Sequence, residues 1–142
     1  MVVWRRRDDN AWLNAAEKVV RELIPEEEEK RQDAVTCGPG PFSMAGPDLV
    51  SDQLGKAGFE RVAFERVDAP ITIGSDIDDA IEFALALGPA GEIMRLAGEA
   101  GAAKRPKVID ALRRAFEGLR AADGTVRAQS STWVVTASPR SS

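Results

Sequence analysis

The acidic side chains are the most obvious candidates for chemistry in this sequence. Asp76, Asp78 and Asp79 stand close together, and carboxylate oxygens are the ligands that Ca²⁺ and Mg²⁺ prefer. The calcium-loop pattern also needs a glycine turn and a glutamate at a set spacing, and neither follows here. Capping a helix start and stabilising its dipole is therefore the better interpretation of these aspartates.

The two densest charge runs do not indicate a catalytic site either. Glu26 to Glu29 is a run of carboxylates, which we interpret as a solvated loop or a frayed helix end rather than a catalytic cluster. Arg5 to Arg7 is the only dense basic run, and Asp8 and Asp9 follow it directly. Mutual charge compensation favours a solvated strand end over a phosphate site.

Residue types that the chain lacks exclude several classes of enzyme. The 142 residues include no histidine, which removes the commonest general base and the commonest metal ligand. Cys37 is the only cysteine, so an intrachain disulfide or a thiol metal cluster cannot form. The net charge of −4 does not favour nucleic-acid binding, which needs a basic excess. Serine triads and zinc chemistry would need a histidine from a partner chain.

Hydrophobic periodicity predicts the elements that position the remaining residues. Trp12, Ala16, Val20 and Leu23, for example, recur at helical spacing. Strands are expected over residues 2–4, 59–67, 69–74 as a continuation past a proline, and 132–137. Helices are expected over about residues 11–23, 47–57, 77–87 and 90–96, with a longer one that begins at Pro106. No repeat or linker is visible, so residues 1–142 are expected to form one domain.

Four stretches in this order resemble a known family. They are Val2 to Trp12, Gly38 to Ser43, Leu54 to Val62, and Thr132 to Ala137. The chain is similar to the C-terminal part of a class I S-adenosylmethionine-dependent methyltransferase of the ubiquinone/menaquinone-biosynthesis type (methyltransferase type 11 group). The stretches resemble that family's fifth strand, its approach to the next helix, its helix-to-sixth-strand junction and its closing strand. Ala11 departs from the family's pattern, which has a proline at this place.

The segment that would hold the cofactor is missing from the resemblance. S-adenosylmethionine sits on a Gly-rich turn after the first strand in the parent family, and this sequence has no such turn between a strand and a helix. Gly38-Pro39-Gly40 is the nearest candidate, but prolines remove backbone donors and no good strand precedes it. The resemblance therefore implies a truncated domain that needs no cofactor of its own and does not catalyse methyl transfer alone.

The fold class that the resemblance implies is α+β. A three-stranded, mostly antiparallel sheet is expected, with the last strand in the centre and about five helices around it. This arrangement would correspond to the C-terminal half of a Rossmann-like methyltransferase fold. Residues 71–124 would form a helical insertion that helps to wall the substrate pocket.

Five residues match positions around that pocket in the family. Trp4, Asn10 and Trp12 lie near the end of the fifth strand, where substrate pockets of this fold open. The structural alternative is that both tryptophans anchor the core and Asn10 caps a helix. Phe42 and Met44 would flank the pocket entrance, or else serve only in packing. No catalytic and no metal-binding residue is expected.

An open sheet edge predicts the partner. In the parent fold the fifth strand lies against a fourth, so Val2 and Val3 would expose unpaired backbone groups. We expect a homodimer, or pairing with a separate N-terminal methyltransferase half, and no nucleic-acid or membrane partner. No apolar run approaches the roughly 18 residues that span a bilayer, and a cytoplasmic location is expected. The alternatives left open are a non-enzymatic small-ligand or protein-binding module that homodimerises, and one subunit of a split methyltransferase.

Overall fold

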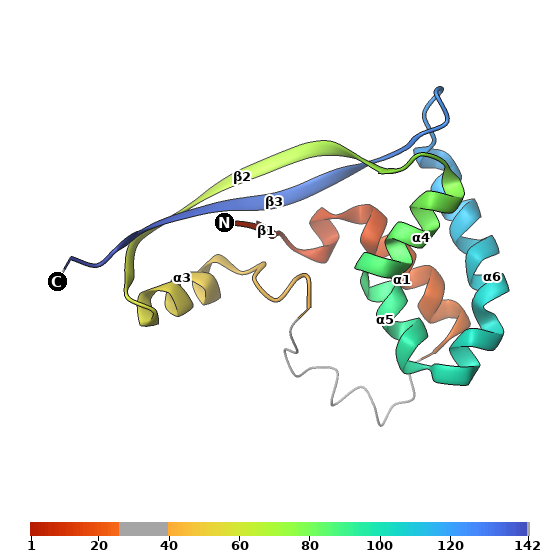
Figure 1. Ribbon diagram of the computed structural model, residues 1–142, viewed down its shortest axis with the longest axis horizontal. Coiled ribbons are helices and arrows are strands. Elements are labelled where there is room, and N and C mark those ends of the chain that lie inside the picture. Colours follow the sequence, from red (N-terminus) through yellow and green to blue (C-terminus); the bar gives the residue numbers. More distant parts are fainter. Residues whose placement is uncertain (26–39, 142) are drawn as a thin grey trace.

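The protein folds as an α+β structure with a three-stranded antiparallel sheet, as predicted (Figure 1). The computed structural model describes residues 1–25 and 40–141. The strands are β1 (Val2–Trp4), β2 (Phe59–Gly74) and β3 (Val126–Pro139). The five α-helices of the described residues are α1 (Ala11–Leu23), α3 (Pro47–Lys56), α4 (Ile77–Leu87), α5 (Pro89–Leu96) and α6 (Gly98–Phe116). Short 3₁₀ turns, η1 (Arg7–Asp9) and η3 (Glu117–Leu119), precede α1 and follow α6.

The last strand lies in the centre of the sheet. The strand order is β1-β3-β2, and β3 runs antiparallel to both neighbours. Trp4 pairs with Thr132 on one side of β3, and Val67 pairs with the same residue on the other. The expected central position of the last strand is therefore confirmed. Because β1 is only 3 residues long, most of the 14-residue β3 pairs with β2 alone.

The second strand is longer than expected. The segments predicted over residues 59–67 and 69–74 form one continuous strand of 16 residues. Pro70 does not interrupt it, because β2 is an edge strand. A proline has no backbone N–H, and on an edge strand this position can face away from the neighbouring strand, where no donor is needed. Arg61 has a φ of 52° at a register shift between Glu60 and Ala63, which marks a β-bulge in this edge strand.

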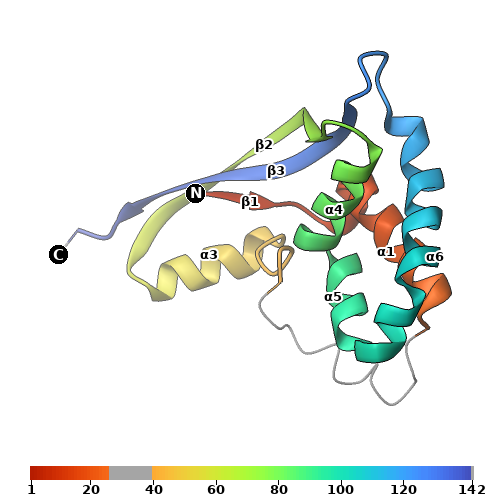
Figure 2. The same cartoon turned by 45° about the vertical axis from the view of Figure 1, so that its right-hand side comes forward.

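Four helices form the main core at one end of the sheet. Helices α1, α4, α5 and α6 pack together in a group that lies apart from α3 (Figure 2). Their largest fully buried side chains include Leu13, Ile81, Leu112 and Phe116. Residues of the sheet that join this cluster include Ile71, Ile73, Val126 and Ala128. Burial of these apolar surfaces is the main force that holds the helices on the sheet.

Helix α3 covers the opposite face of the sheet. Trp133 donates a hydrogen bond from Nε1 to the carbonyl of Ala45, 3.2 Å away, just before α3 begins. Side chains alternate between faces along a strand, and Trp133 is an odd number of residues from Val126 and Ala128, which face the main core. The Phe64 ring meets the Trp133 ring edge-on at 6.0 Å on this second face.

The start of the longest helix differs from the prediction. Helix α6 begins at Gly98 rather than at Pro106, and Pro106 lies inside it. An interior proline removes one hydrogen bond of the helix, which usually favours a helix start at that place. Close packing holds the first turns in place: a Cβ added to Gly101 would lie 2.3 Å from the carbonyl oxygen of Met94 in α5. The tertiary contact overrides the local preference.

The junction between α4 and α5 is equally tight. A Cβ added to Gly91 would lie 1.6 Å from the carbonyl oxygen of Leu85, and one added to Gly88 would lie 2.9 Å from the carbonyl oxygen of Ala84. No side chain fits at Gly91 unless α5 moves relative to α4. These two glycines set how closely the two helices approach.

Candidate functional site

Asn10, the first predicted pocket residue, is completely buried beside the central strand. Its Nδ2 donates to the carbonyls of Arg6 and Ser131, both at 3.1 Å, and its Oδ1 accepts from the backbone N–H of Ser131 at 2.9 Å. The side-chain amide thus pairs with Ser131 as the backbone of a strand residue would. Asn10 occupies the N-cap position of α1, but its side chain makes no capping hydrogen bond. Asn10 is thus at the cap position that the structural alternative named, but its side chain serves the strand rather than the helix.

The two predicted tryptophans lie against the main core. Trp12 is 3% exposed, and its ring stacks on that of Phe83 with a centroid separation of 5.8 Å. Trp4 is half-buried and packs against the same core cluster. Neither ring lines the two cavities described below. These positions favour core anchoring, and a role of the tryptophans in substrate binding stays a prediction.

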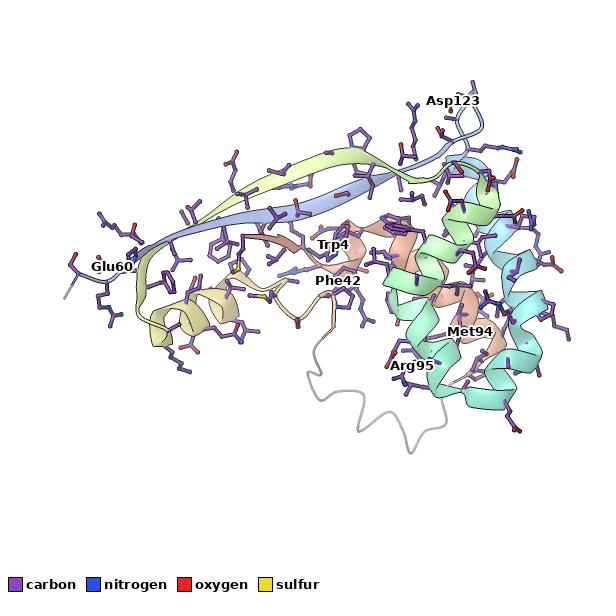
Figure 3. All side chains as sticks on the ribbon, viewed as in Figure 1. Trp4, Phe42, Glu60, Met94, Arg95 and Asp123 are labelled. Carbon is purple, nitrogen blue, oxygen red and sulfur yellow. The ribbon has the colours of Figure 1, made fainter. Side chains whose placement is uncertain are left out.

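Phe42 and Met44 lie on the connection that leads into α3. Both side chains are half-buried, and the guanidinium of Arg7 lies 5.7 Å from the centre of the Phe42 ring. Figure 3 shows Trp4 and Phe42 in the middle of the molecule, between the helical group and α3. The structure therefore places Phe42 beside a cation, which no local sequence pattern indicates.

A polar cluster lies where β1 ends. The guanidinium nitrogens of Arg5 lie 3.2 Å from a carboxylate oxygen of Asp9 and 3.4 Å from one of Asp68. The same guanidinium lies 4.9 Å from the centre of the Trp133 ring. Ser131 donates its hydroxyl to Asp68 at 2.6 Å. Ser131 is buried, only 4% exposed, and the chain has no histidine that could complete a Ser-His-Asp triad with it. The cluster fixes Arg5 at the strand end.

The carboxyl group of Asp68 is the titrating group of this cluster. The hydrogen bond from Ser131 lowers the pKa of Asp68, and Arg66 and Arg5 lower it further, while burial opposes the shift. We expect Ser131→Ala to raise the Asp68 pKa toward its ordinary value, because the largest cause of the shift is removed. An NMR titration of the side-chain carboxyl carbon measures this directly.

The sign of the pH effect follows from the direction of that shift. A carboxyl group whose pKa is lower in the folded state stabilises the fold above its unfolded pKa of about 3.9. This contribution is lost as the pH falls through the lower folded pKa. Ser130→Ala is the matched control, because Ser130 is also buried but makes no hydrogen bond to Asp68. Equal Asp68 titration curves in the two variants would contradict the assignment.

A small cavity of about 270 Å³ opens beside the polar cluster. It is lined by Arg5, Arg6, Asp9, Ala45, Pro47 and Trp133. The Nε of Arg5 is buried there without a hydrogen-bond partner among the described residues. This cavity lies at the end of β1, where the resemblance implied a substrate pocket, and its size suits a small polar group.

A larger cavity of about 900 Å³ lies among α1, α4, α5 and α6. Its lining includes Ile24, Leu85, Leu87, Ile93, Leu96 and Ala97, with Arg7, Glu17, Arg21, Glu92, Arg95 and Lys104 among them. Figure 3 shows Arg95 on α5, one of the helices that wall it. Helices α4, α5 and α6 belong to the segment 71–124 that was expected to form a pocket wall. Its polar residues come from distant parts of the chain, so no local sequence motif indicates the cavity.

A buried carboxylate links two of the cavity's arginines. The side chain of Glu17 is only 9% exposed, and both of its oxygens lie 2.9 Å from Nη1 of Arg7. Arg21 adds a hydrogen bond from Nε at 3.1 Å. Two guanidinium groups therefore pair with one carboxylate, and these contacts offset the cost of burying it.

The aspartates at the start of α4 have structural roles. Asp76 accepts a hydrogen bond from the N–H of Asp79 at 2.9 Å, which confirms the predicted cap. Asp79 accepts from the N–H of Ser75, and Asp78 pairs with Arg113. Within residues 1–25 and 40–141, no group of acidic, histidine or cysteine side chains could hold a metal ion.

None of the described helices combines the length and the apolarity needed to cross a membrane.

The comparisons with known proteins leave the family open. No protein-family model matches the chain, and no curated protein matches it. The likeness to class I methyltransferases thus depends on the sequence stretches and the order of the elements, and it stays a prediction.

Proposed function

We propose that the chain is the C-terminal part of a methyltransferase-like fold that completes its sheet by pairing with another polypeptide. The observation that supports this proposal is the strand order β1-β3-β2, with β3 antiparallel to both neighbours. The resemblance to the methyltransferase family implies this same order. Such a half-domain does not bind S-adenosylmethionine by itself, because the Gly-rich turn is not among its elements.

The two edges of the sheet differ in a way that supports pairing through β1. The free edge of β2 carries Pro70 and a bulge at Arg61, both of which hinder the addition of another strand. The edge at β1 is short, with 3 residues, and carries neither a proline nor a bulge. Met1 and Val2 are 51% and 66% exposed, and both are apolar. A partner strand would bury these side chains and satisfy the open backbone groups.

Calorimetric titration with S-adenosylmethionine, together with the mass in solution, tests the proposal. We expect no binding heat from the isolated chain, and a mass of two chains. Val2→Lys should weaken self-association at least about tenfold, because a charge would be buried at the new interface. Folding should be unaffected, since Val2 is exposed in the single chain.

The matched control places the same charge on the other edge. Thr72→Lys changes an exposed residue of β2 and should leave the mass unchanged. Micromolar binding of S-adenosylmethionine would contradict the proposal, because the chain would then hold a cofactor site of its own. A monomer at every concentration would exclude the homodimer and direct the search to a separately encoded N-terminal half.

A non-enzymatic ligand-binding module is the second candidate function. The 900 Å³ cavity favours it, because its size lies in the range of small-molecule sites. A gene that encodes a Gly-rich cofactor turn next to this one would favour the split methyltransferase instead. A cytoplasmic location remains part of the proposal, and cell fractionation tests it.

A further inference from the structure

The large cavity has the apolar wall that a small organic ligand needs. Ile24, Leu85 and Ile93 contribute apolar surface to it, and Leu87 and Leu96 line it while 39% and 67% exposed. A ligand that covered these side chains would remove apolar surface from water, at about 25 cal/mol per Å².

The charges around the cavity favour an anion. Four cationic and two acidic side chains line it, although the chain as a whole carries a net charge of −4. Both lining carboxylates are already paired: Glu17 with two arginines, and Glu92 with Arg95 at 2.6 Å. An anionic ligand would therefore meet no unpaired carboxylate among the described lining residues.

Lys104 is the cation best placed to receive that anion. Its ammonium group donates to the carbonyl oxygen of Leu23, 2.5 Å away at the end of α1. No described carboxylate lies within ion-pair distance of it. The bond to Leu23 stabilises the C-terminal end of α1, but an ammonium group has three donors. The remaining donors can bind an oxyanion at the wall of the cavity.

We propose that this cavity binds an organic anion with an apolar body, and that Lys104 holds its anionic group. A carboxylate or a phosphate ester on an alkyl chain or ring system has this chemistry. The apolar body would lie against Ile24, Leu85 and Ile93. This inference rests on the second candidate function, the ligand-binding module, and names its ligand class; it requires neither a cofactor nor a partner strand.

Calorimetric titration of the full chain with decanoate, decanol and decylamine tests the proposal. We expect decanoate to bind at least about tenfold more tightly than decanol, and decylamine to bind most weakly. Lys104→Gln should remove the preference for decanoate over decanol, and Lys104→Arg should retain it. Lys107→Gln, an exposed lysine of the same helix, is the matched control and should leave all three affinities unchanged.

A second variant separates binding from folding. Lys104→Gln also alters the end of α1, so its thermal unfolding is recorded alongside. Ala100→Phe places a ring in the cavity from an exposed position and should abolish decanoate binding while the protein stays folded. Absence of heat with all three probes, equal affinity for decanoate and decanol, or unchanged binding in Ala100→Phe would each overturn the proposal.

Discussion

Asn10→Ala is expected to lower the free energy of unfolding by about 3 kcal/mol. The variant loses the three hydrogen bonds that Asn10 makes with the backbone of Arg6 and Ser131. The N–H of Ser131 would then be buried without a partner, and such a group costs about 1–3 kcal/mol. Urea unfolding followed by circular dichroism measures the change.

Asn14→Ala is the control for this loss. Asn14 lies one turn further along α1, and its side chain donates to Asp8 in an exposed hydrogen bond of 3.2 Å. Its removal should change the stability by no more than about 0.5 kcal/mol. Equal effects of the two substitutions would show that the pairing between Asn10 and Ser131 contributes little.

Gly91→Ala is expected to destabilise the protein by about 3 kcal/mol, the upper end for overpacking. The new Cβ would lie 1.6 Å from the carbonyl oxygen of Leu85, which is backbone and cannot rotate away. Helix α5 would have to move away from α4, and the contacts of α5 with α1 would weaken. Thermal and urea unfolding both report the loss.

Gly55→Ala provides the opposite expectation. Gly55 lies in α3, and a Cβ added there would meet no atom within 4 Å. Alanine favours helix by about 0.5–1 kcal/mol relative to glycine, so this variant should be slightly more stable. A Gly91→Ala protein as stable as the parent would mean that α5 can shift without cost.

Local patterns predicted the elements well where the cause is local. The aspartates at the start of the helix expected over residues 77–87 predicted a cap, and Asp76 provides it in the structure. The β-branched and aromatic residues at 132–137 predicted a strand that lies within β3. The prediction that a helix starts at Pro106 is wrong, because the packing of Gly101 against α5 overcomes the local preference of proline for a helix start. That contact joins two helices, and no short window of sequence contains it.

The candidate sites were harder to predict for the same reason. Asn10 pairs with a residue 121 positions away, so its neighbours in the sequence indicate only a helix cap. Glu17 and Lys104 each have an ordinary local interpretation, one as a polar position of α1 and the other as a surface lysine. Only the fold brings Glu17 and Lys104 to one cavity. The Gly38-Pro39-Gly40 stretch and Cys37 lie wholly or partly outside the described residues.

The central position of β3 has a consequence for biosynthesis. Both other strands hydrogen-bond to β3, yet β3 is synthesised after them. While the ribosome synthesises the chain, β1 and the 16-residue β2 have no partner strand until β3 emerges. Such pairings between distant segments form slowly, and exposed strands of nascent chains attract chaperones or other unfolded chains. Yield in the cell should therefore depend on how quickly translation proceeds from β2 to β3.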